Sequence, residues 1–218
     1  MNIKTIEVAG FRPALHGMRN PMNSWDKSDT VYHTTEEHYP DEPFHTTIDF
    51  LLGENDADLS RRLQNAGPEH CKHLRMIMVW ADITAPRYWW QEFDTYRVGV
   101  EKVSCSTMHK LMARPLTLDD FEHSGIDDGT VVQYLEAAIS ILNMDIHHYN
   151  NVIPEQKKSI WRGIIQTLPQ SYLQKRTVMM SYAALRNIYR QREGHKLQEW
   201  QTFREWVESL PESWMITE

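Results

Sequence analysis

Residues 75–99, RMIMVWADITAPRYWWQEFDTYRVG, carry the clearest structural signal in the chain. The run up to Ile83 is apolar and β-prone, and Pro86 closes it, which predicts a strand. Residues 87–97 predict a helix, because three large rings then share one face: Trp89, Trp90 and Phe93. The sequence Val-Gly-Val at 98–100 breaks that helix. A strand leading directly into a helix with an aromatic face predicts helices packed on a sheet.

The remaining elements are weaker signals. Alternating residues 3–8 predict a half-buried strand, whereas the proline-containing residues 12–47 predict a stretch that is largely loop with short helices. Helices are predicted at 51–65, 131–149 and 177–207, and residues 68–74 predict a first helical turn. The 177–207 segment is one helix or a pair, with Gly194 as its weak point. Few strands and several long helices predict one α+β domain over residues 1–218.

Composition limits the class of protein. The chain has 218 residues, 41% of them hydrophobic and 24% charged, which is ordinary for a globular protein. Its formal net charge of −7 argues against binding a nucleic-acid polymer or a membrane surface, but leaves a small anionic ligand open. The first residues lack the continuous apolar stretch of a leader, so none is expected, and no run of about 18 apolar residues occurs. The two cysteines form no C-x-x-C pair. A cytoplasmic protein is expected.

The segment 185–195 breaks its own helical pattern. Leu185, Ile188 and Tyr189 define an apolar stripe, and the next positions on it are Arg192 and His195. A buried unpaired guanidinium costs several kcal/mol, so Arg192 must meet an acid, an anionic ligand or a polarised carbonyl. The alternatives are a helix end in solvent, or a structural salt bridge with Glu92 or Asp94.

Arg97 could likewise bind an anionic ligand or have only a structural role. It precedes a turn and then the hydroxyl-rich run Val103-Ser104-Cys105-Ser106-Thr107. Arginine presents a bidentate fork to phosphate, and serine hydroxyls with turn amides complete an anion cradle. Such a run is, however, also typical of a helix cap or turn.

Four segments together carry a resemblance to a known family: PEH at 68–70, ITAPRYWWQEFDTYRVG at 83–99, SCSTMH at 104–109 and LRNIYRQREGHKLQEW at 185–200. They resemble a divergent branch of the flavin-dependent thymidylate synthases that occurs in phages and gut bacteria. The resemblance covers residues 68–206, in two blocks in the same order as in the family.

The family signature is R-H-R-x-x-S-x-N-E-x-S-x-R-Y. Placed without gaps after Ala85-Pro86, its R-H-R falls on Thr95, Tyr96 and Arg97, so that only the last arginine is kept. Its later serine falls at or beside Cys105, between Ser104 and Ser106. In the second block, N-x-x-x-x-R followed by His matches Asn187, Arg192 and His195, the histidine one residue early. A histidine before the first strand corresponds to His70 or His73.

The resemblance implies a small, mostly antiparallel sheet with several long helices. It also implies a homotetramer with FAD at a subunit interface. Methylene-tetrahydrofolate would donate a carbon to C5 of dUMP, and flavin reduced by NADPH would supply a hydride. The protein would then be an FAD-dependent methyltransferase, with side chains that position and polarise the reactants.

Roles for single residues follow from the same resemblance. Arg192 would contact the pyrimidine edge and stabilise charge there, and Arg97 with Ser104 or Ser106 would bind the phosphate. Arg186 is assigned to the substrate as well. The cofactor neighbours would be His70, Tyr96, Arg97, Asn187 and His195. Ser104 and Ser106 are counted with Arg192 as catalytic residues, and no residue is assigned to a metal.

Two further hypotheses remain open. The same fold and pocket could hydroxymethylate dUMP at C5 for a modified phage genome. Alternatively, the chain is a non-catalytic scaffold that has lost flavin and binds a nucleotide or a protein partner, which the missing Arg-His of the signature favours.

Several residues resemble metal ligands or nucleophiles but have simpler explanations. The pairs His147-His148 and His70-x-x-His73 have metal-like spacing, but eleven histidines make chance pairs common. Cys105 resembles a nucleophile, but a small buried cysteine is the expected outcome. Trp200, Trp206 and Trp214 are expected to serve packing or subunit contact.

Overall fold

A computed structural model describes residues 1–37, 45–125 and 129–218 of the chain. The strands are β1 (Asn2–Ala9), β2 (Val31–Glu37), β3 (His45–Leu51), β4 (Met78–Pro86), β5 (Val100–Ser104) and β6 (Leu173–Ser181). The helices are α1 (Phe11–Met18), α2 (Glu54–Ala66), α3 (Arg87–Phe93), α4 (Thr107–Lys110), α5 (Gly129–Asn151), α6 (Pro154–Thr167), α7 (Tyr182–Gln191), α8 (Gln198–Glu208) and α9 (Trp214–Thr217). Short 3-10 helices include η1 (Asn20–Met22), η2 (Trp25–Lys27), η3 (Lys72–Arg75), η4 (Leu111–Ala113) and η5 (Leu118–Asp120).

A four-stranded antiparallel sheet forms the centre of the molecule. Its strand order is β1-β4-β6-β5, so the two central strands are far apart in the sequence. On β4 every second residue from Val79 to Ala85 is fully buried, and Val178 and Met180 of β6 point to the same face. The predicted strands at 3–8 and 75–83 are therefore confirmed, as β1 and β4.

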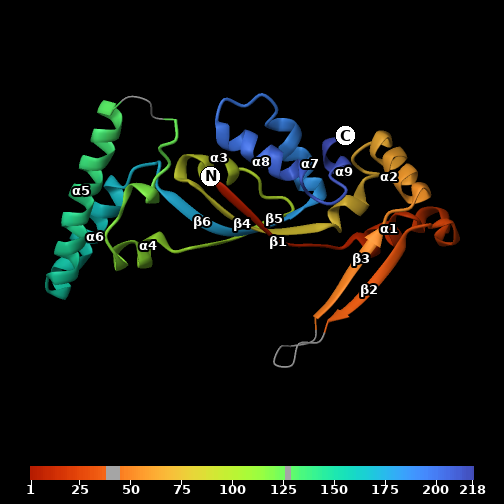
Figure 1. The fold of residues 1–218 in the computed structure, drawn as a ribbon, viewed down its shortest axis with the longest axis horizontal. Helices are drawn as coiled ribbons and strands as arrows, with labels where there is room; N and C mark the ends of the chain where they lie inside the picture. The colour runs from red at the N-terminus through yellow and green to blue at the C-terminus, as the bar shows by residue number, and fades with distance from the viewer. Residues whose placement is uncertain (38–44, 126–128) are drawn as a thin grey trace.

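One face of this sheet is covered by helices. Figure 1 shows α3, α7 and α8 above the strands, with α9 and α2 beside them. The predicted aromatic face of α3 is confirmed, because Trp89, Trp90 and Phe93 are buried, and Trp200 of α8 packs on Trp89 with ring centroids 4.9 Å apart. Aromatic packing between α3 and α8 thus fixes the layer that carries the candidate site.

A second apolar cluster lies at one end of the molecule. The long helix α5 packs against α6 there, as Figure 1 shows. The predicted 131–149 helix is confirmed, with Leu135, Ile139, Leu142 and Ile146 on its buried face. Helix α6 was not predicted from the sequence, since its single fully buried residue is Ile164.

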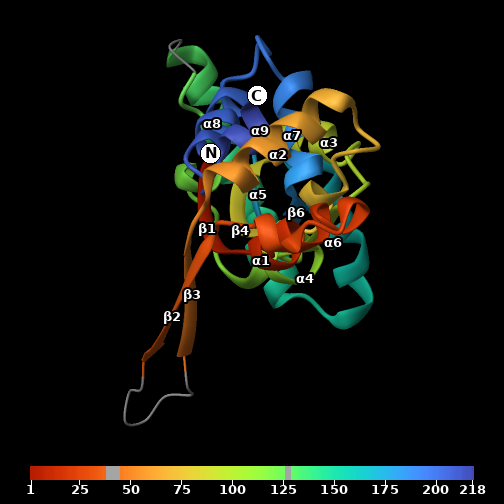
Figure 2. The same cartoon turned by 90° about the vertical axis from the view of Figure 1, so that its right-hand side faces the viewer.

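The expectation that residues 12–47 are largely loop is wrong in part. Helix α1 and two short 3-10 helices are present, but β2 and β3 form an antiparallel hairpin that projects from the molecule (Figures 1 and 2). The prolines at 40 and 43, which contributed to the loop prediction, lie outside the described residues. The β-branched and aromatic residues of VYHTTEE at 31–37 and HTTIDFL at 45–51 are the strand signal that was overlooked.

Several other elements differ from prediction, and α3 ends at Phe93 instead of residue 97. Residues 177–181 belong to β6 and not to a helix, and residue 51 ends β3, so that α2 begins at Glu54. The segment 100–104 is strand β5. The turn predicted at 68–74 is the 3-10 helix η3 and begins at Lys72. The helix pair at the C-terminal end is confirmed, with Gly194 at a φ of 63° between α7 and α8.

Within the described parts of the chain, we find no helix with both the length and the apolar character of a membrane span.

Candidate functional site

A cavity of about 810 Å³ opens between the first turns of α7, the end of α2 and the segment that leads into β4. We call it the α7 cavity. It is lined by Gln64, Gly67, Pro68, Cys71, Leu74, Arg75, Met78, Val98, Gly99, Ser181, Ala183, Ala184, Arg186, Asn187 and Arg190. Three of these residues are arginines and none is acidic. Much of the remaining wall is apolar, so the cavity suits a ligand that is both anionic and aromatic.

The N-terminus of α7 forms part of this wall. Ser181 is the N-cap, and its Oγ accepts a hydrogen bond from the Ala184 backbone N–H at 3.2 Å. Gly99 adopts a φ of +70°, and a Cβ there would lie 2.7 Å from Ser181 Oγ. Position 99 therefore needs glycine. The positive end of the helix dipole, next to the arginines, adds to the attraction for an anion.

Arg186 is the least satisfied polar group of the cavity. Its Nη1 donates a hydrogen bond to Gln64 Oε1, but its buried Nε has no partner among the described residues. Burial lowers the pKa of Arg186, and the nearby positive charge of Arg190 lowers it further. An anion in the cavity would supply both the missing acceptor and the missing negative charge.

A buried chain of hydrogen bonds holds Gln64 in place. Gln64 Nε2 donates to Ser60 Oγ at 3.2 Å, and Ser60 Oγ lies 2.9 Å from His73 Nε2. Ser60 and His73 are almost completely buried. Since the Gln64 amide is oriented from behind, its Oε1 is fixed toward Arg186. His73 and Ser60 are therefore positioning residues for the cavity.

His73 makes stability depend on pH. Burial, with a smaller contribution from Arg186, lowers the pKa of His73 to about 4. The unfolded chain takes up this proton below a pH of about 6.5 but the folded chain only near 4, so the stabilisation is complete above 6.5 and is lost as the pH falls. The free energy of unfolding should decrease by about 3 kcal/mol from this group between pH 7 and 4.

Urea denaturation at pH 7 and pH 4.5 measures this effect. In His73→Gln the decrease should be much smaller, whereas the exposed control His147→Gln should retain it. An equal decrease in His73→Gln and the unmodified protein would contradict the assignment.

A second group of predicted residues surrounds Glu92, and we call Glu92, Tyr96, Arg192, His195 and Trp200 the Glu92 cluster. Glu92 Oε2 accepts hydrogen bonds from Arg192 Nη1 at 2.7 Å and Trp200 Nε1 at 2.9 Å, and His195 Nε2 lies 3.3 Å away. Arg192 Nε also donates to Tyr96 Oη at 2.8 Å, and its guanidinium stacks on the Trp200 ring, 4.2 Å from the centroid. The cluster joins α3 to the end of α7.

These contacts explain how the chain accommodates the buried Arg192. The side chain of Arg192 is only 16% exposed, as the apolar stripe predicted, but Glu92 supplies its counter-charge within the chain. The structural salt bridge with Glu92, one of the alternatives, is the one observed. Burial alone therefore does not require a ligand at Arg192, and its role at a pyrimidine stays a prediction.

The predicted site residues fall into three places on one chain. Arg186 and Asn187 line the α7 cavity, and His70 is exposed in the short segment between two of its wall residues, Pro68 and Cys71. Tyr96, Arg192 and His195 belong to the Glu92 cluster. Arg97 follows Tyr96 and is exposed.

The remaining two residues lie elsewhere. Ser104 ends β5, opposite Arg176, and Ser106 precedes α4. Ser104 is five residues beyond Gly99, or roughly 16 Å along an extended strand. The structure thus does not bring Ser104 and Ser106 to the α7 cavity of the same chain.

Sequence reasoning missed several wall residues of the α7 cavity. Arg190 lies four positions after Arg186, so helical spacing could have placed both on one face. Ser181 could have been recognised as an N-cap once the helix start was known. Gln64 had no comparable signal, because it reaches Arg186 across 122 positions of sequence.

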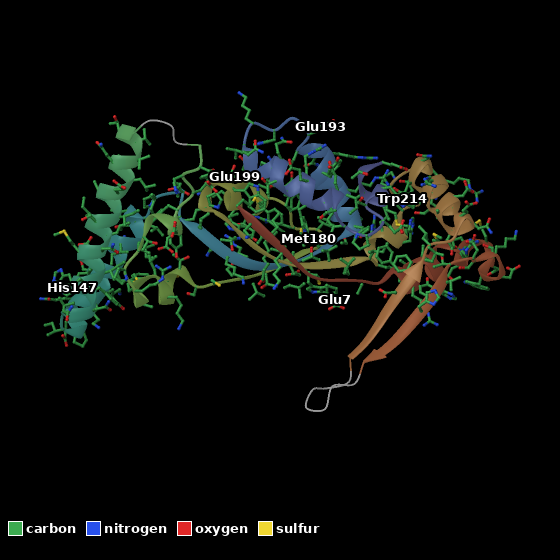
Figure 3. The ribbon with its side chains drawn as sticks, viewed as in Figure 1. Glu7, His147, Met180, Glu193, Glu199 and Trp214 are labelled. Carbon is green, nitrogen blue, oxygen red and sulfur yellow. The ribbon has the colours of Figure 1, made fainter. Side chains whose placement is uncertain are left out.

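The histidine pairs and the two cysteines were considered as possible metal ligands or nucleophiles. Among the described residues, no group of three or more His, Cys, Asp or Glu side chains is arranged to hold a metal ion. Figure 3 shows His147 on the helical pair at one end of the molecule, far from Glu193, which lies between α7 and α8, and from Glu199 on α8. Both cysteines are free. Cys71 is buried, but the expectation of burial is wrong for Cys105, which is exposed just after β5.

Comparison with known proteins identifies solved structures that share this fold. No protein-family model and no curated protein sequence matches the chain. Among solved structures, Thymidylate Synthase X (ThyX) from Helicobacter pylori with FAD and dUMP aligns with a TM-score of 0.73 at 16% identity, over 100% of this chain and 98% of that one. A second Helicobacter pylori structure, the flavin-dependent thymidylate synthase ThyX complexed with FAD and dUMP, aligns with a TM-score of 0.65 at 16% identity over the same shares. The chain therefore has the α+β fold of the flavin-dependent thymidylate synthases, which the sequence resemblance predicted.

Proposed function

We propose that the protein is an FAD-dependent thymidylate synthase-like enzyme, which methylates dUMP reductively at C5 with methylene-tetrahydrofolate and NADPH. The observation that supports it best is the α7 cavity, an apolar pocket with three arginines and a buried guanidinium N–H that has no acceptor among the described residues. It occurs on the fold of proteins whose solved structures contain FAD and dUMP.

The α7 cavity fits a flavin nucleotide. Leu74, Met78 and Ala184 offer flat apolar surface for a ring system, and Arg186 and Arg190 offer charge for phosphates. Because Gly99 has no Cβ, the space beside Ser181 and Ala184 at the N-terminus of α7 stays open. Asn187 and the nearby His70 would complete the polar contacts of this cofactor.

The pyrimidine nucleotide would lie at the Glu92 cluster. Asn187 and Arg192 are separated by five helical positions, about 7.5 Å along the axis, so that a cofactor and a nucleotide bound at these residues would be neighbours. Glu92 and Tyr96 hold the Arg192 guanidinium rigidly, and its remaining N–H groups would stabilise negative charge on the uracil carbonyl. Arg97 would contact the phosphate.

A second copy of the chain would complete this site. Ser104 and Ser106 belong neither to the Glu92 cluster nor to the wall of the α7 cavity of their own chain, so we assign them to the phosphate of a nucleotide bound mainly by a neighbouring subunit. This arrangement agrees with the interfacial site and the homotetramer that the sequence resemblance implies.

When bound, the flavin supplies the hydride and the folate supplies the carbon. The residues of the chain position and polarise the nucleotide, and they exclude water with the apolar wall of the cavity.

The visible absorption spectrum of the purified protein, before and after addition of FAD, tests the proposal first. A bound flavin should be followed by release of tritium from 5-tritiated dUMP when methylene-tetrahydrofolate and NADPH are present. The mass of the product would distinguish methylation from hydroxymethylation. Well-folded protein that neither binds flavin nor releases tritium would refute the proposal.

A second candidate is a scaffold that binds a nucleotide without flavin. The observation that favours it is the salt bridge of Arg192 with Glu92, which neutralises the guanidinium before any ligand arrives. Binding of dUMP by protein that fails to take up FAD would support this candidate over the enzyme.

Arg186 and Arg190 should dominate flavin affinity. Each charge-assisted hydrogen bond contributes about 1.5–3 kcal/mol, so Arg186→Gln or Arg190→Gln should raise the Kd for FAD roughly 10- to 100-fold. Quenching of flavin fluorescence measures this Kd. Arg62→Gln is the matched control, because Arg62 is on α2 but forms an exposed pair with Asp58 outside the cavity. Unchanged affinity in both cavity variants would place the flavin elsewhere.

A further inference from the structure

A separate cavity of about 530 Å³ lies beside α1, on the other side of the segment that joins η3 to β4. We call it the N-terminal cavity. It is lined by Arg12, Pro13, His16, Gly17, Arg19, Asn20, Trp25, Ser28, Tyr32 and Met76. Arg75, next to Met76, and Met78, two residues after it, line the α7 cavity, so the two cavities are adjacent but have no wall residue in common. Nothing in the proposed function uses the N-terminal cavity.

The wall of this cavity is cationic. Arg12, His16 and Arg19 line it, and none of its lining residues is acidic. The nearest buried acid, Asp56, lies behind Arg19 and is already saturated. Its Oδ1 accepts from Arg19 Nε at 2.6 Å, and its Oδ2 accepts from Ser28 Oγ at 2.7 Å and Thr30 Oγ1 at 2.6 Å.

Arg19 consequently has unused donors. The residue is 3% exposed, and its Nη1 makes a long hydrogen bond of 3.3 Å to the Ser24 carbonyl oxygen. Its Nη2 is buried and has no hydrogen-bond partner among the described residues. A buried guanidinium N–H in a cavity wall without an acceptor indicates that an anion or a water belongs there.

An aromatic surface stands beside these charges. The side chain of Trp25 is held by a hydrogen bond of 2.8 Å from its Nε1 to Asn20 Oδ1, yet the residue is 44% exposed. His16 stacks on it with an interplanar angle of 18° and centroids 6.0 Å apart. On another wall, the Arg12 guanidinium lies over the Tyr32 ring, 5.4 Å from its centroid. A fixed, exposed indole next to cations is typical of sites that stack a planar ligand and bind its charge.

We propose that the N-terminal cavity binds a nucleoside 5′-monophosphate group, with its base stacked on Trp25 and its phosphate at Arg12, His16 and the free N–H of Arg19. The group is either a free nucleotide or the nucleotide end of a dinucleotide cofactor. The cavity shares no wall residue with the α7 cavity, so a free nucleotide would bind independently of the proposed catalytic site, whereas a dinucleotide would reach from one cavity into the other.

Calorimetric titration with AMP, adenosine and inorganic phosphate tests the proposal. Trp25→Ala and Arg12→Gln change exposed side chains and should fold normally, whereas Arg19 is left intact because it pairs with Asp56. Each variant should raise the Kd for AMP at least tenfold. Trp25→Ala should weaken adenosine but not phosphate, and Arg12→Gln should weaken phosphate but not adenosine. Arg190→Gln, in the α7 cavity, is the control and should leave AMP affinity unchanged.

Titration of the same variants with FAD separates the two sources of the group. A weaker FAD complex in Trp25→Ala identifies the group as one end of a dinucleotide, and an unchanged FAD complex together with a weaker AMP complex identifies a free nucleotide. The proposal is overturned if AMP does not bind, if Trp25→Ala and Arg12→Gln bind it normally, or if only Arg190→Gln loses it. None of these three outcomes decides the proposed thymidylate synthase activity, since that activity is measured separately by tritium release.

Discussion

Replacement of Asp56 by alanine is expected to lower the free energy of unfolding by about 3–5 kcal/mol. Asp56 is completely buried and is the only carboxylate that Arg19 contacts within the described residues. Burial pushes the pKa of Asp56 upward, but hydrogen bonds from Thr30, Ser28 and Arg19 outweigh it and leave the pKa below 3.8. The carboxylate is therefore charged when folded, and its loss would leave a buried guanidinium without a counter-ion.

Urea or guanidinium denaturation at pH 7 measures this loss. Asp58→Ala is the matched control on the same helix, because the pair of Asp58 with Arg62 is about two-thirds exposed on each side and should change stability by less than about 0.5 kcal/mol. Asp56→Asn keeps the shape and tests the charge alone. If Asp56→Ala and Asp58→Ala had equal effects, the pair with Arg19 would not be a structural element.

The second large effect is expected for Trp89→Ala, with a loss of about 3–5 kcal/mol. Trp89 is fully buried, and its ring lies 4.9 Å from each of three others, those of Trp90, Phe93 and Trp200. Removal of the indole leaves a cavity between α3 and α8 that close packing cannot refill. Since α3 carries Glu92 and α8 carries Trp200, the Glu92 cluster should loosen as well.

Chemical denaturation tests this prediction with two comparisons. Trp25→Ala removes an indole that is 44% exposed and should change stability by no more than about 0.5 kcal/mol. Trp89→Phe should cost less than Trp89→Ala, because Trp89 Nε1 has no hydrogen-bond partner among the described residues and its loss breaks no bond. A small effect of Trp89→Ala would mean that another contact holds α3 on α8.

Helices whose apolar residues recur at regular helical spacing could be predicted from the sequence. Short apolar runs that fit both a helix and a strand could not. The aromatic face of α3 and the apolar face of α5 follow directly from spacings of three and four residues. The run TVMMS at 177–181 fits a helix and a strand equally well by pattern. It is a strand because β6 pairs with β4 on one side and β5 on the other, which the local sequence does not specify.

The candidate site was predicted in part for a similar reason. Arg186 and Asn187 were identified, and they line the α7 cavity. Arg192 was predicted to be buried, and it is, but the partner that satisfies it is 100 positions away in the sequence. The same holds for Gln64 and Arg186, and for Arg19 and Asp56, whose pairings depend on how helices meet in space.

The mixed α+β class, the apolar faces of the main helices and the resemblance to the flavin-dependent thymidylate synthases could all be read from the amino-acid sequence, because they depend on local spacing and on short motifs. Which charges are neutralised and which are left for a ligand follows instead from how the folded segments meet. Arg192 is paired with Glu92, whereas Arg186 and Arg19 keep buried N–H groups that find no acceptor in the described parts of the chain. Whether a charge is satisfied depends on distances of a few ångströms between segments remote in sequence, and such distances exist only once the chain has packed.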